Sequence, residues 1–452
     1  MSNLYAGFCR KNIDPRHGLP VAGYFVPRFV KGKLDSLEVN AVAVSSYGKT
    51  AVIAVCDLLD IGSTAFANEC RRAVSESAGV DPEAVFIACT HTHTGPSTDV
   101  DRDPDYAADI NEYRAFLKSR IADATAEAVA DLSPATLASG RGRAPGIAFG
   151  RRYLMKDGSV RTNPGVGNPN VVHPLSEADD RINVLRFCRG ESGKPDVAIA
   201  CFGVHPDTIG GEKISADWPG FARRTFEAAV PSARLVMLNG AEGDINHVNV
   251  SPKPGDLNGM ILDFDDVSRG YAHARHMGNS IAGGILQIWE KLPLSDDVRV
   301  RACMTRAAIP SNMPAADELV RAEEINRLHL AGRDGELPYT GMMLTTVVAE
   351  AGRMVALKDG PEAFEMPFSA LAIGRNVFVG IPGEPFGAIG KALRDLPGWN
   401  SVIPCCLTNG SEGYFPMKDS YAEGGYEARS SRFKAGVGEL IIDCCEKMIR
   451  DL

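Results

Sequence analysis

Two histidines separated by one residue stand where a predicted strand ends. His91 and His93 belong to the segment T-H-T-H-T-G-P at 90–96, which directly follows the apolar run 85–89. In extended backbone, side chains at i and i+2 face the same side, so both imidazoles would point at one spot. Converging imidazoles suit a metal site or a metal ligand paired with a base. Polar loop histidines are the alternative, but the chain has only nine histidines, so two placed here favour function.

A third histidine occupies a similar position. His205 follows the apolar run 197–204 and precedes Pro206 and Asp207. The end of a strand that opens into a turn is where open α/β sheets place ligands. Taken alone, such a histidine is more often structural. Together with His91 it becomes a candidate second metal ligand.

Three further segments carry polar groups, each with low specificity. Glu384 lies in I-P-G-E-P-F at 381–386, where Gly383 permits close approach of backbone or ligand, although a solvated turn has the same composition. The segment N-G-A-E-G-D-I-N-H at 239–247 is typical of a tight loop. The segment at 409–416 contains Tyr414 and is followed by further tyrosines. A tyrosine there can be a metal ligand, a proton donor or an oxyanion partner, or it can simply pack.

Other catalytic signatures are missing from the sequence. It contains no G-x-S-x-G, no P-loop, no H-E-x-x-H and no dinucleotide-binding fingerprint with its acidic residue. The candidate chemistry therefore rests on the histidines, the glutamate and the tyrosines.

The elements that must position these residues alternate between strands and helices. Short apolar runs predict buried strands at 39–44, 51–56, 84–89, 197–204 and 235–238. Helical patterns occupy 63–77, 221–230, 268–289, 315–328 and 433–450. Two alternating runs within 364–381 flank Gly374-Arg375-Asn376, which predicts a hairpin. We therefore expect an α/β fold, with long irregular loops at 141–180 and 248–266 that serve function.

Composition narrows the class of protein. The 452 residues are 44% hydrophobic and 23% charged, which excludes disordered and fibrous chains. A net charge of −9 disfavours nucleic acid and anionic membranes as partners. No apolar run approaches the roughly 18 residues that span a bilayer, and the N-terminus lacks a signal core. Eleven cysteines without any C-x-x-C predict a reducing, cytoplasmic location.

Taken together, these segments resemble the neutral ceramidase family, whose members are zinc-dependent amidohydrolases that cleave an N-acyl bond. The likeness runs in order from about Tyr5 to Phe433. It includes H-T-H-[ST]-G-P at 91–96, H-P at 205–206, P-[GA]-E at 382–384, and a pair of tyrosines twelve residues apart, Tyr414 and Tyr426. One such motif would be weak evidence, whereas several in the family's order make coincidence implausible.

The resemblance implies a site and a fold. The ligands of one catalytic Zn²⁺ would be His91, His205, Glu384 and Tyr414. His93 would transfer a proton, Tyr426 would stabilise the oxyanion, and Arg151 would match the family's Asn-Arg-Ser arginine, with Gly150 in place of the Asn. The implied fold is α/β, with central mixed β-sheets flanked by helices. Because no linker divides the chain and the ligands span most of it, we expect one domain over 1–452.

The departures from the family concern the substrate. Asn246 occupies the place of the family's serine, and an amide cannot act as that hydroxyl would. We expect Asn246, His247 and Asp244 to contact the substrate. The likeness covers the catalytic domain only, without the family's C-terminal sandwich domain and without a signal peptide. A small polar substrate is therefore expected in place of ceramide.

The sequence thus predicts a cytoplasmic zinc-dependent hydrolase that cleaves an amide by metal-activated water. Two alternatives stay open: a metal-dependent esterase, lactonase or phosphoesterase, and a non-catalytic binding protein that retains the metal. The expected partner is a small molecule, with no nucleic acid and no membrane, and a homo-oligomer is compatible with the sequence.

Overall fold

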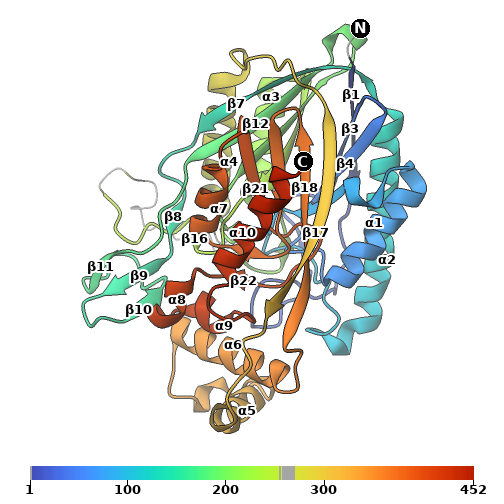
Figure 1. Ribbon diagram of the computed structural model, residues 1–452. Helices are drawn as coiled ribbons and strands as arrows, with labels where there is room; N and C mark the ends of the chain where they lie inside the picture. Colours follow the sequence, from blue (N-terminus) through green and yellow to red (C-terminus); the bar gives the residue numbers. More distant parts are fainter. Residues whose placement is uncertain (1–2, 254–255, 257–269) are drawn as a thin grey trace.

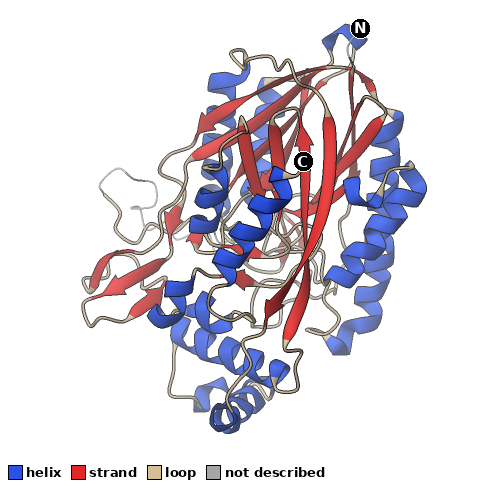
Figure 2. Ribbon diagram, in the orientation of Figure 1, coloured by secondary structure: helices blue, strands red, loops and turns tan. Residues whose placement is uncertain are grey.

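Three larger mixed sheets meet at the centre of the molecule, and helices cover their outer faces (Figures 1 and 2). The computed structural model describes residues 3–253, 256 and 270–452. This arrangement confirms the expected α/β class with central mixed sheets flanked by helices.

The first sheet has the strand order β5-β4-β3-β1-β6. Its strands are β1 (Leu4–Asn12), β3 (Glu38–Ser46), β4 (Lys49–Cys56), β5 (Val85–Cys89) and β6 (Ser133–Pro134). Helices α1 (Thr64–Ala78) and α2 (Ala107–Ala130) pack on its outer face. Alternation along β3 explains the two faces: Val39 and Ala41 join the helix-covered cluster, whereas Val42 and Val44 point into the central core.

The second sheet has the order β15-β13-β12-β7, with β13 and β15 parallel. Its strands are β7 (Thr136–Arg143), β12 (Arg181–Cys188), β13 (Asp196–Phe202) and β15 (Ala233–Asn239). Helices α3 (Asp217–Ala229) and α4 (Tyr271–Trp289) cover it, and Trp218, Phe226 and Ile281 fill the space between helices and sheet. The predicted helix 268–289 begins at Tyr271 in the structure, and its residues 268 and 269 lie outside the described residues.

The third sheet has the order β17-β18-β19-β21. Its strands are β17 (Val300–Pro310), β18 (Ala363–Ile373), β19 (Asn376–Gly380) and β21 (Ser401–Cys405). Strands β18 and β19 pair antiparallel around Gly374 and Arg375, as the predicted hairpin requires. Helices α7 (Gly387–Arg394) and α10 (Val437–Arg450) pack against this sheet.

The rest of the described chain forms short strands and four further helices. The remaining strands are β2 (Gly32–Lys33), β8 (Phe149–Gly150), β9 (Arg152–Met155), β10 (Val160–Thr162), β11 (Val171–Pro174), β14 (Lys213–Ile214), β16 (Ile245–Asn246), β20 (Glu384–Pro385) and β22 (Tyr414–Phe415). The remaining helices are α5 (Ala316–Leu330), α6 (Gly341–Leu357), α8 (Lys418–Glu423) and α9 (Tyr426–Ser430), with 3₁₀ turns at Pro82–Ala84, Pro104–Tyr106, Gly190–Ser192 and Asp334–Glu336.

One expectation about loops needs correction. The segment 141–180 was expected to be irregular, but it contains β8, and β9 to β11 form a small sheet that projects from the body (Figure 1). Backbone pairing between short strands satisfies the polar groups that an irregular loop would leave to water. Much of the second expected loop, 248–266, lies outside the described residues.

The inner faces of the three sheets share one apolar core. Phe86 from the first sheet, Ile199 from the second and Phe378 from the third belong to the same buried cluster. Each large side chain buried in this way contributes about 1.5–3 kcal/mol to folding. The core therefore fixes the three sheets relative to one another.

The carboxyl ends of strands from all three sheets are tied together by two asparagines. The amide of Asn239, at the end of β15, donates to Thr90 O at 3.1 Å, just past β5. The side chain of Asn409, a few residues past β21, accepts from Ile87 N at 3.0 Å, and its backbone N–H donates to Ile87 O at 2.7 Å. Residues that follow these strands are consequently brought to one place.

Among the described residues, no helix is both long and apolar enough to cross a membrane.

A buried ion pair joins α3 to the first sheet and gives a test of the packing. Arg223 donates to both oxygens of Asp57, at 2.9 and 2.5 Å, and Asp57 is fully buried. Arg223→Met leaves that carboxylate uncompensated, so we expect the free energy of unfolding to fall by about 3–5 kcal/mol. Chemical denaturation measures the change.

The matched control for this prediction is the neighbouring Arg224→Met. The Arg224 side chain is 45% exposed and lies 3.4 Å from Asp35, so its removal should cost at most about 1 kcal/mol. A double variant that also replaces Asp57 by Leu should recover much of the loss. Equal effects of the two single variants would contradict this account.

Candidate metal centre

Three imidazole rings converge beyond the strand ends. His91 and His93 follow β5, and His205 follows β13. The ring centroid of His91 lies 4.9 Å from that of His93 and 4.9 Å from that of His205, and the other two rings are 6.0 Å apart. The structure thus brings together the three histidines that sequence spacing singled out.

The backbone at His91 is not the extended chain that the sequence argument assumed. Its φ is +75°, in the left-handed region that non-glycine residues adopt only when their surroundings hold them there. The His91 N–H donates to Leu58 O at 2.9 Å, which fixes this turn. The two rings therefore meet because the chain turns at His91, and the alternation of a strand does not explain their position.

Each of the three histidines directs its Nδ1 atom at backbone carbonyl oxygens. The distances are 2.9 Å from His91 to Leu59 O and 3.0 Å from His93 to Gly23 O. Nδ1 of His205 lies 2.9 Å from Glu242 O. A carbonyl only accepts, so each Nδ1 carries a hydrogen, and Nε2 is the ring atom left to bind a cation or a second proton. This fixed tautomer is the one that metal-binding histidines use.

Two carboxylates face these rings. Glu384 Oε2 lies 3.1 Å from His205 Nε2 and 3.4 Å from His91 Nε2. Glu242 Oε2 lies 2.5 Å from His205 Nδ1. One ligand atom from each of His91, His205, Glu242 and Glu384 lies within 4.8 Å of the others, as does one from each of the three histidines.

Glu242 is the residue that sequence reasoning missed. It sits in a Gly-rich loop whose composition fits many ordinary turns, and no spacing rule distinguishes it there. Its position just past β15 was the available signal, since His91 and His205 also follow strand ends.

The donor set fits a divalent cation. The Nε2 atoms of the three histidines and Oε2 of Glu384 are buried and make no hydrogen bond of ordinary geometry within the described chain. Lone pairs that face one another at 3.1–3.4 Å repel unless a proton or a cation lies between them. Imidazole nitrogen with carboxylate oxygen is a donor set that Zn²⁺ accepts.

The pKa shifts of the histidines also indicate that the cluster favours a cation. Burial and the charge of Arg151 lower the pKa of His205, but the carboxylates of Glu242 and Glu384 outweigh them and raise it to about 10. Burial also lowers the pKa of His91, and the same two carboxylates again raise it overall. The cluster therefore attracts positive charge strongly, and a cation would compete with these protons.

Two tyrosines lie beside the cluster. Tyr414 in β22 is the register partner of Glu384 in β20, and its ring stacks on that of His205 with centroids 6.4 Å apart. The Tyr426 ring lies 5.6 Å from that of Tyr414. Burial and the charge of Glu384 raise the pKa of Tyr426 to about 12, so its hydroxyl keeps its proton at neutral pH.

Arg151 is held by a buried carboxylate. Its Nε donates to Glu427 Oε1 at 2.6 Å and its Nη2 to Gly243 O at 2.7 Å. Thr162 donates to the other oxygen of Glu427 at 2.8 Å. The guanidinium carbon lies 5.4 Å from the Tyr414 ring centroid. Glu427 thus fixes a positive charge beside the tyrosine.

Asn246, His247 and Asp244, the three residues expected to contact substrate, each have different partners in the structure. The Asn246 amide donates to Asn163 Oδ1 at 2.9 Å and its oxygen accepts from Val248 N at 3.0 Å. His247 Nδ1 lies 3.0 Å from Asp207 Oδ1. Asp244 accepts from Gly387 N at 2.7 Å and from the Ser176 hydroxyl, contacts that anchor the loop.

Two glycines permit the close approach of segments around Glu384. A Cβ on Gly243 would lie 2.4 Å from Glu384 O, and one on Gly383 would lie 2.5 Å from Gly413 O. Neither position tolerates a side chain without a backbone shift. Gly383 therefore has the close-approach role that the sequence suggested.

Comparison with known proteins identifies the fold. No protein-family model matches the sequence, and a search of curated proteins finds no match. Solved structures do match: one described as a ceramidase complexed with C2 has a TM-score of 0.74 and 18% identity, over 100% of this chain and 76% of that chain. Neutral ceramidase from Pseudomonas aeruginosa has a TM-score of 0.72 and 18% identity, over 100% of this chain and 75% of that one.

The chain has the neutral ceramidase fold. The resemblance inferred from ordered motifs is confirmed at this level. At 18% identity the match establishes the fold, and the chemistry of the site rests on the geometry described above.

The contact between Glu242 and His205 gives a prediction about the candidate metal centre. Glu242→Gln removes the charge beside His205 Nδ1, which weakens the basicity of that imidazole. We expect the affinity for Zn²⁺ to fall by about 10–100-fold, measured by competition with a chromophoric chelator. Glu227→Gln is the control. Glu227 lies on α3, where its partly buried carboxylate pairs with Arg10 of β1, so this variant should leave the affinity unchanged. Equal affinities in all three proteins would exclude a supporting role for Glu242.

Proposed function

We propose that this protein is a zinc-dependent hydrolase that cleaves an amide (N-acyl) bond in a small polar molecule. The observation that carries the proposal is a cluster of three buried Nε2 atoms, each on a ring whose Nδ1 faces a backbone carbonyl, in which those of His91 and His205 lie 3.4 and 3.1 Å from Glu384 Oε2. The structural relatives are named as ceramidases, and the family that the motifs resemble cleaves N-acyl bonds.

His91, His205 and Glu384 would hold the ion, with Tyr414 as a fourth ligand and Glu242 supporting His205. A bound Zn²⁺ at such a site acidifies water to a pKa of about 7 and polarises a carbonyl oxygen.

His93 is suited to move a proton. Burial holds the pKa of His93 well below its usual range, so the imidazole is neutral. Its Nδ1–H is engaged by Gly23 O, which leaves Nε2 as the atom that accepts a proton and later returns it to the leaving amine.

Tyr426 and Arg151 are suited to stabilise negative charge. The Tyr426 hydroxyl, still protonated at neutral pH, can donate to the carbonyl oxygen as that oxygen becomes an oxyanion. Burial and the charge of Glu384 hold the pKa of Tyr414 well above its usual value, and the charge of the adjacent Arg151 acts in the opposite direction. Because Tyr426 and Arg151 are held before substrate arrives, little reorganisation is needed in the transition state.

The surroundings favour a polar substrate. Asn246 stands in the place of the family's serine and offers no nucleophilic hydroxyl. Its side-chain amide donates to Asn163, so a substrate would meet two hydrogen-bonded amide groups here. His247 Nδ1 lies 3.0 Å from Asp207 Oδ1, so both offer polar groups, and Asp207 acts electrostatically on His93. In this proposal Asn246 and His247 contact the substrate, while Asp244 acts by anchoring their loop.

The cytoplasmic location is part of the proposal. All eleven cysteines are free, which supports a reducing compartment. The proposed partner is a small molecule, with neither nucleic acid nor membrane.

A substrate panel tests the reaction class. We expect the purified protein to hydrolyse short N-acyl amides, to lose this activity with a chelator and to regain it with Zn²⁺. Glu384→Ala should be inactive, whereas the control Glu227→Gln should retain activity. Turnover of lactones, esters or phosphoesters alone would overturn the amidase assignment. Ligand-induced thermal shifts without turnover of any compound would indicate a binding protein.

A second experiment separates positioning from metal binding. Glu427→Gln removes the charge that fixes Arg151, so we expect kcat to fall about a hundredfold while the affinity for Zn²⁺ stays at the wild-type value. Glu423→Gln is the matched control, because Glu423 pairs with the adjacent Arg152 at 2.9 Å and is partly exposed. If kcat were unchanged, or fell only together with zinc, Arg151 would not act in the way proposed.

A further inference from the structure

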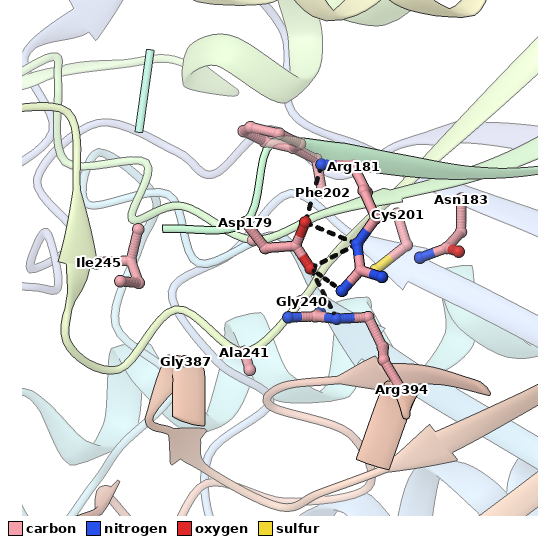
Figure 3. Close-up of a pocket in the computed structure, with 11 residues that line it drawn as sticks. Asp179, Arg181, Asn183, Cys201, Phe202, Gly240, Ala241, Ile245, Gly387 and Arg394 are labelled. Carbon is pink, nitrogen blue, oxygen red and sulfur yellow. Dashed lines mark hydrogen bonds and ion pairs between the residues drawn. The ribbon is translucent and has the colours of Figure 1, made fainter. Parts of the chain in front are cut away.

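The described chain contains another concave site, a cavity of about 480 Å³. It lies between the chain near Arg143, the segment 177–181 that leads into β12, and helix α7. A narrower cleft continues inward from it to Gly240 and Ala241 (Figure 3). None of the side chains assigned to the candidate metal centre lines this cavity.

Its lining is more basic than the protein as a whole. Four basic side chains line the cavity against three acidic ones, in a chain whose net charge is −9. The basic residues are Arg143, Arg181, Lys391 and Arg394, and the acidic residues are Glu177, Asp179 and Asp180. A local excess of positive charge in a concave site concentrates anions.

One carboxylate serves two guanidinium groups at the junction of cavity and cleft. Arg181 donates to Asp179 through Nε at 2.9 Å and Nη2 at 2.7 Å, while Arg394 Nε lies 2.8 Å from Asp179 Oδ2. In Figure 3 both guanidiniums point at this single carboxylate. Two guanidinium groups therefore contact one carboxylate, and N–H donors remain on each arginine beyond those that Asp179 engages.

The fold holds Arg394 in this place. Its side chain is 11% exposed, and its terminal nitrogens lie over Gly390, where a Cβ would come within 3.3 Å of Nη2 and 2.4 Å of the Ala241 side chain. Glycine at this helical position leaves the space that the guanidinium needs. Burial lowers the pKa of Arg394 more than Asp179 raises it, so the guanidinium charge is incompletely compensated.

We propose that this cavity binds a small anion that carries a carboxylate or phosphate group, held by Arg394 and Arg181. The planar fork of arginine matches both oxyanions, since two parallel N–H groups can engage two oxygens. Such an anion would add a second negatively charged group in direct contact with the two guanidiniums. The inference is independent of the proposed hydrolase activity, because it uses none of the metal-cluster residues.

An occupant would lie against the loop that supports the candidate centre. Gly240, Ala241 and Ile245 line the cleft, and the backbone oxygen of Ile245 accepts from His205 N at 3.1 Å. Anion binding should therefore stabilise the folded chain as a whole, which makes thermal unfolding a suitable readout.

The experiment titrates the full-length protein with inorganic phosphate and, separately, with succinate, at constant ionic strength. We expect a saturable rise in Tm with at least one of them, and the anion that acts identifies the oxyanion. Arg394→Gln should weaken the response by about tenfold or more, and it leaves Asp179 paired with Arg181. If that variant does not fold, Arg181→Gln serves the same purpose.

A variant with the opposite expectation makes the test sharper. Asp179→Asn removes the competing negative charge yet keeps an oxygen for the Arg181 N–H, so it should bind the anion more tightly than wild type. Arg333→Gln, an exposed arginine paired with Glu336, is the matched control and should respond like wild type. No saturable response in wild type, an unchanged response in Arg394→Gln, or weaker binding in Asp179→Asn would each overturn the proposal.

Discussion

The structure depends on how a buried cluster of five polar side chains is satisfied where the strands of three sheets end. The cluster consists of His91, His93, His205, Glu242 and Glu384. His205 Nε2 and Glu384 Oε2 lie 3.1 Å apart, and both atoms are buried without a hydrogen bond of ordinary geometry in the described chain. An arrangement of this kind is unfavourable unless positive charge lies between the groups. The backbone carbonyls of Leu59, Gly23 and Glu242 accept from the Nδ1 atoms of the three histidines, so each Nε2 atom faces the centre of the cluster. A bound cation is the simplest physical reason for the whole arrangement.

The architecture explains how such a cluster can be tolerated. Three sheets bury their inner faces in one apolar core, and the free energy gained by burying that core offsets the cost of burying a polar cluster. Asn239 and Asn409 then join the strand ends, so residues distant in the chain meet within a few ångströms. Around this centre the side chains act in pairs: Glu242 with His205, Glu427 with Arg151. Each pair places a charge where the proposed reaction would need it.

Much of the fold could be predicted from sequence, because buried strands are short apolar runs. The runs at 39–44 and 51–56 correspond to β3 and β4, and the hairpin around Gly374 is present. Helix α2 was not among the expected elements, although Ile110, Tyr113, Leu117 and Ile121 recur at helical spacing and all face the core. Its many charged and alanine residues obscure a periodicity that was available.

The site was predictable where residue type and local spacing carry the signal. His91, His93 and His205 follow apolar runs, and the tyrosines repeat a family interval. Glu242 and Glu427 could not be found in this way, because their roles depend on contacts across the fold with His205 and Arg151. The turn at His91 was also beyond the sequence, since a positive φ at a histidine is set by its surroundings.

The central claim is that the buried cluster holds a metal ion. Elemental analysis of the purified wild-type protein beside His91→Ala tests it most directly, with Glu227→Gln as a control that leaves the cluster intact. The account predicts about one zinc ion per chain in the wild type and the control, and a large loss in His91→Ala. Wild-type protein without tightly held metal, or a His91→Ala variant that retains it fully, would contradict the account.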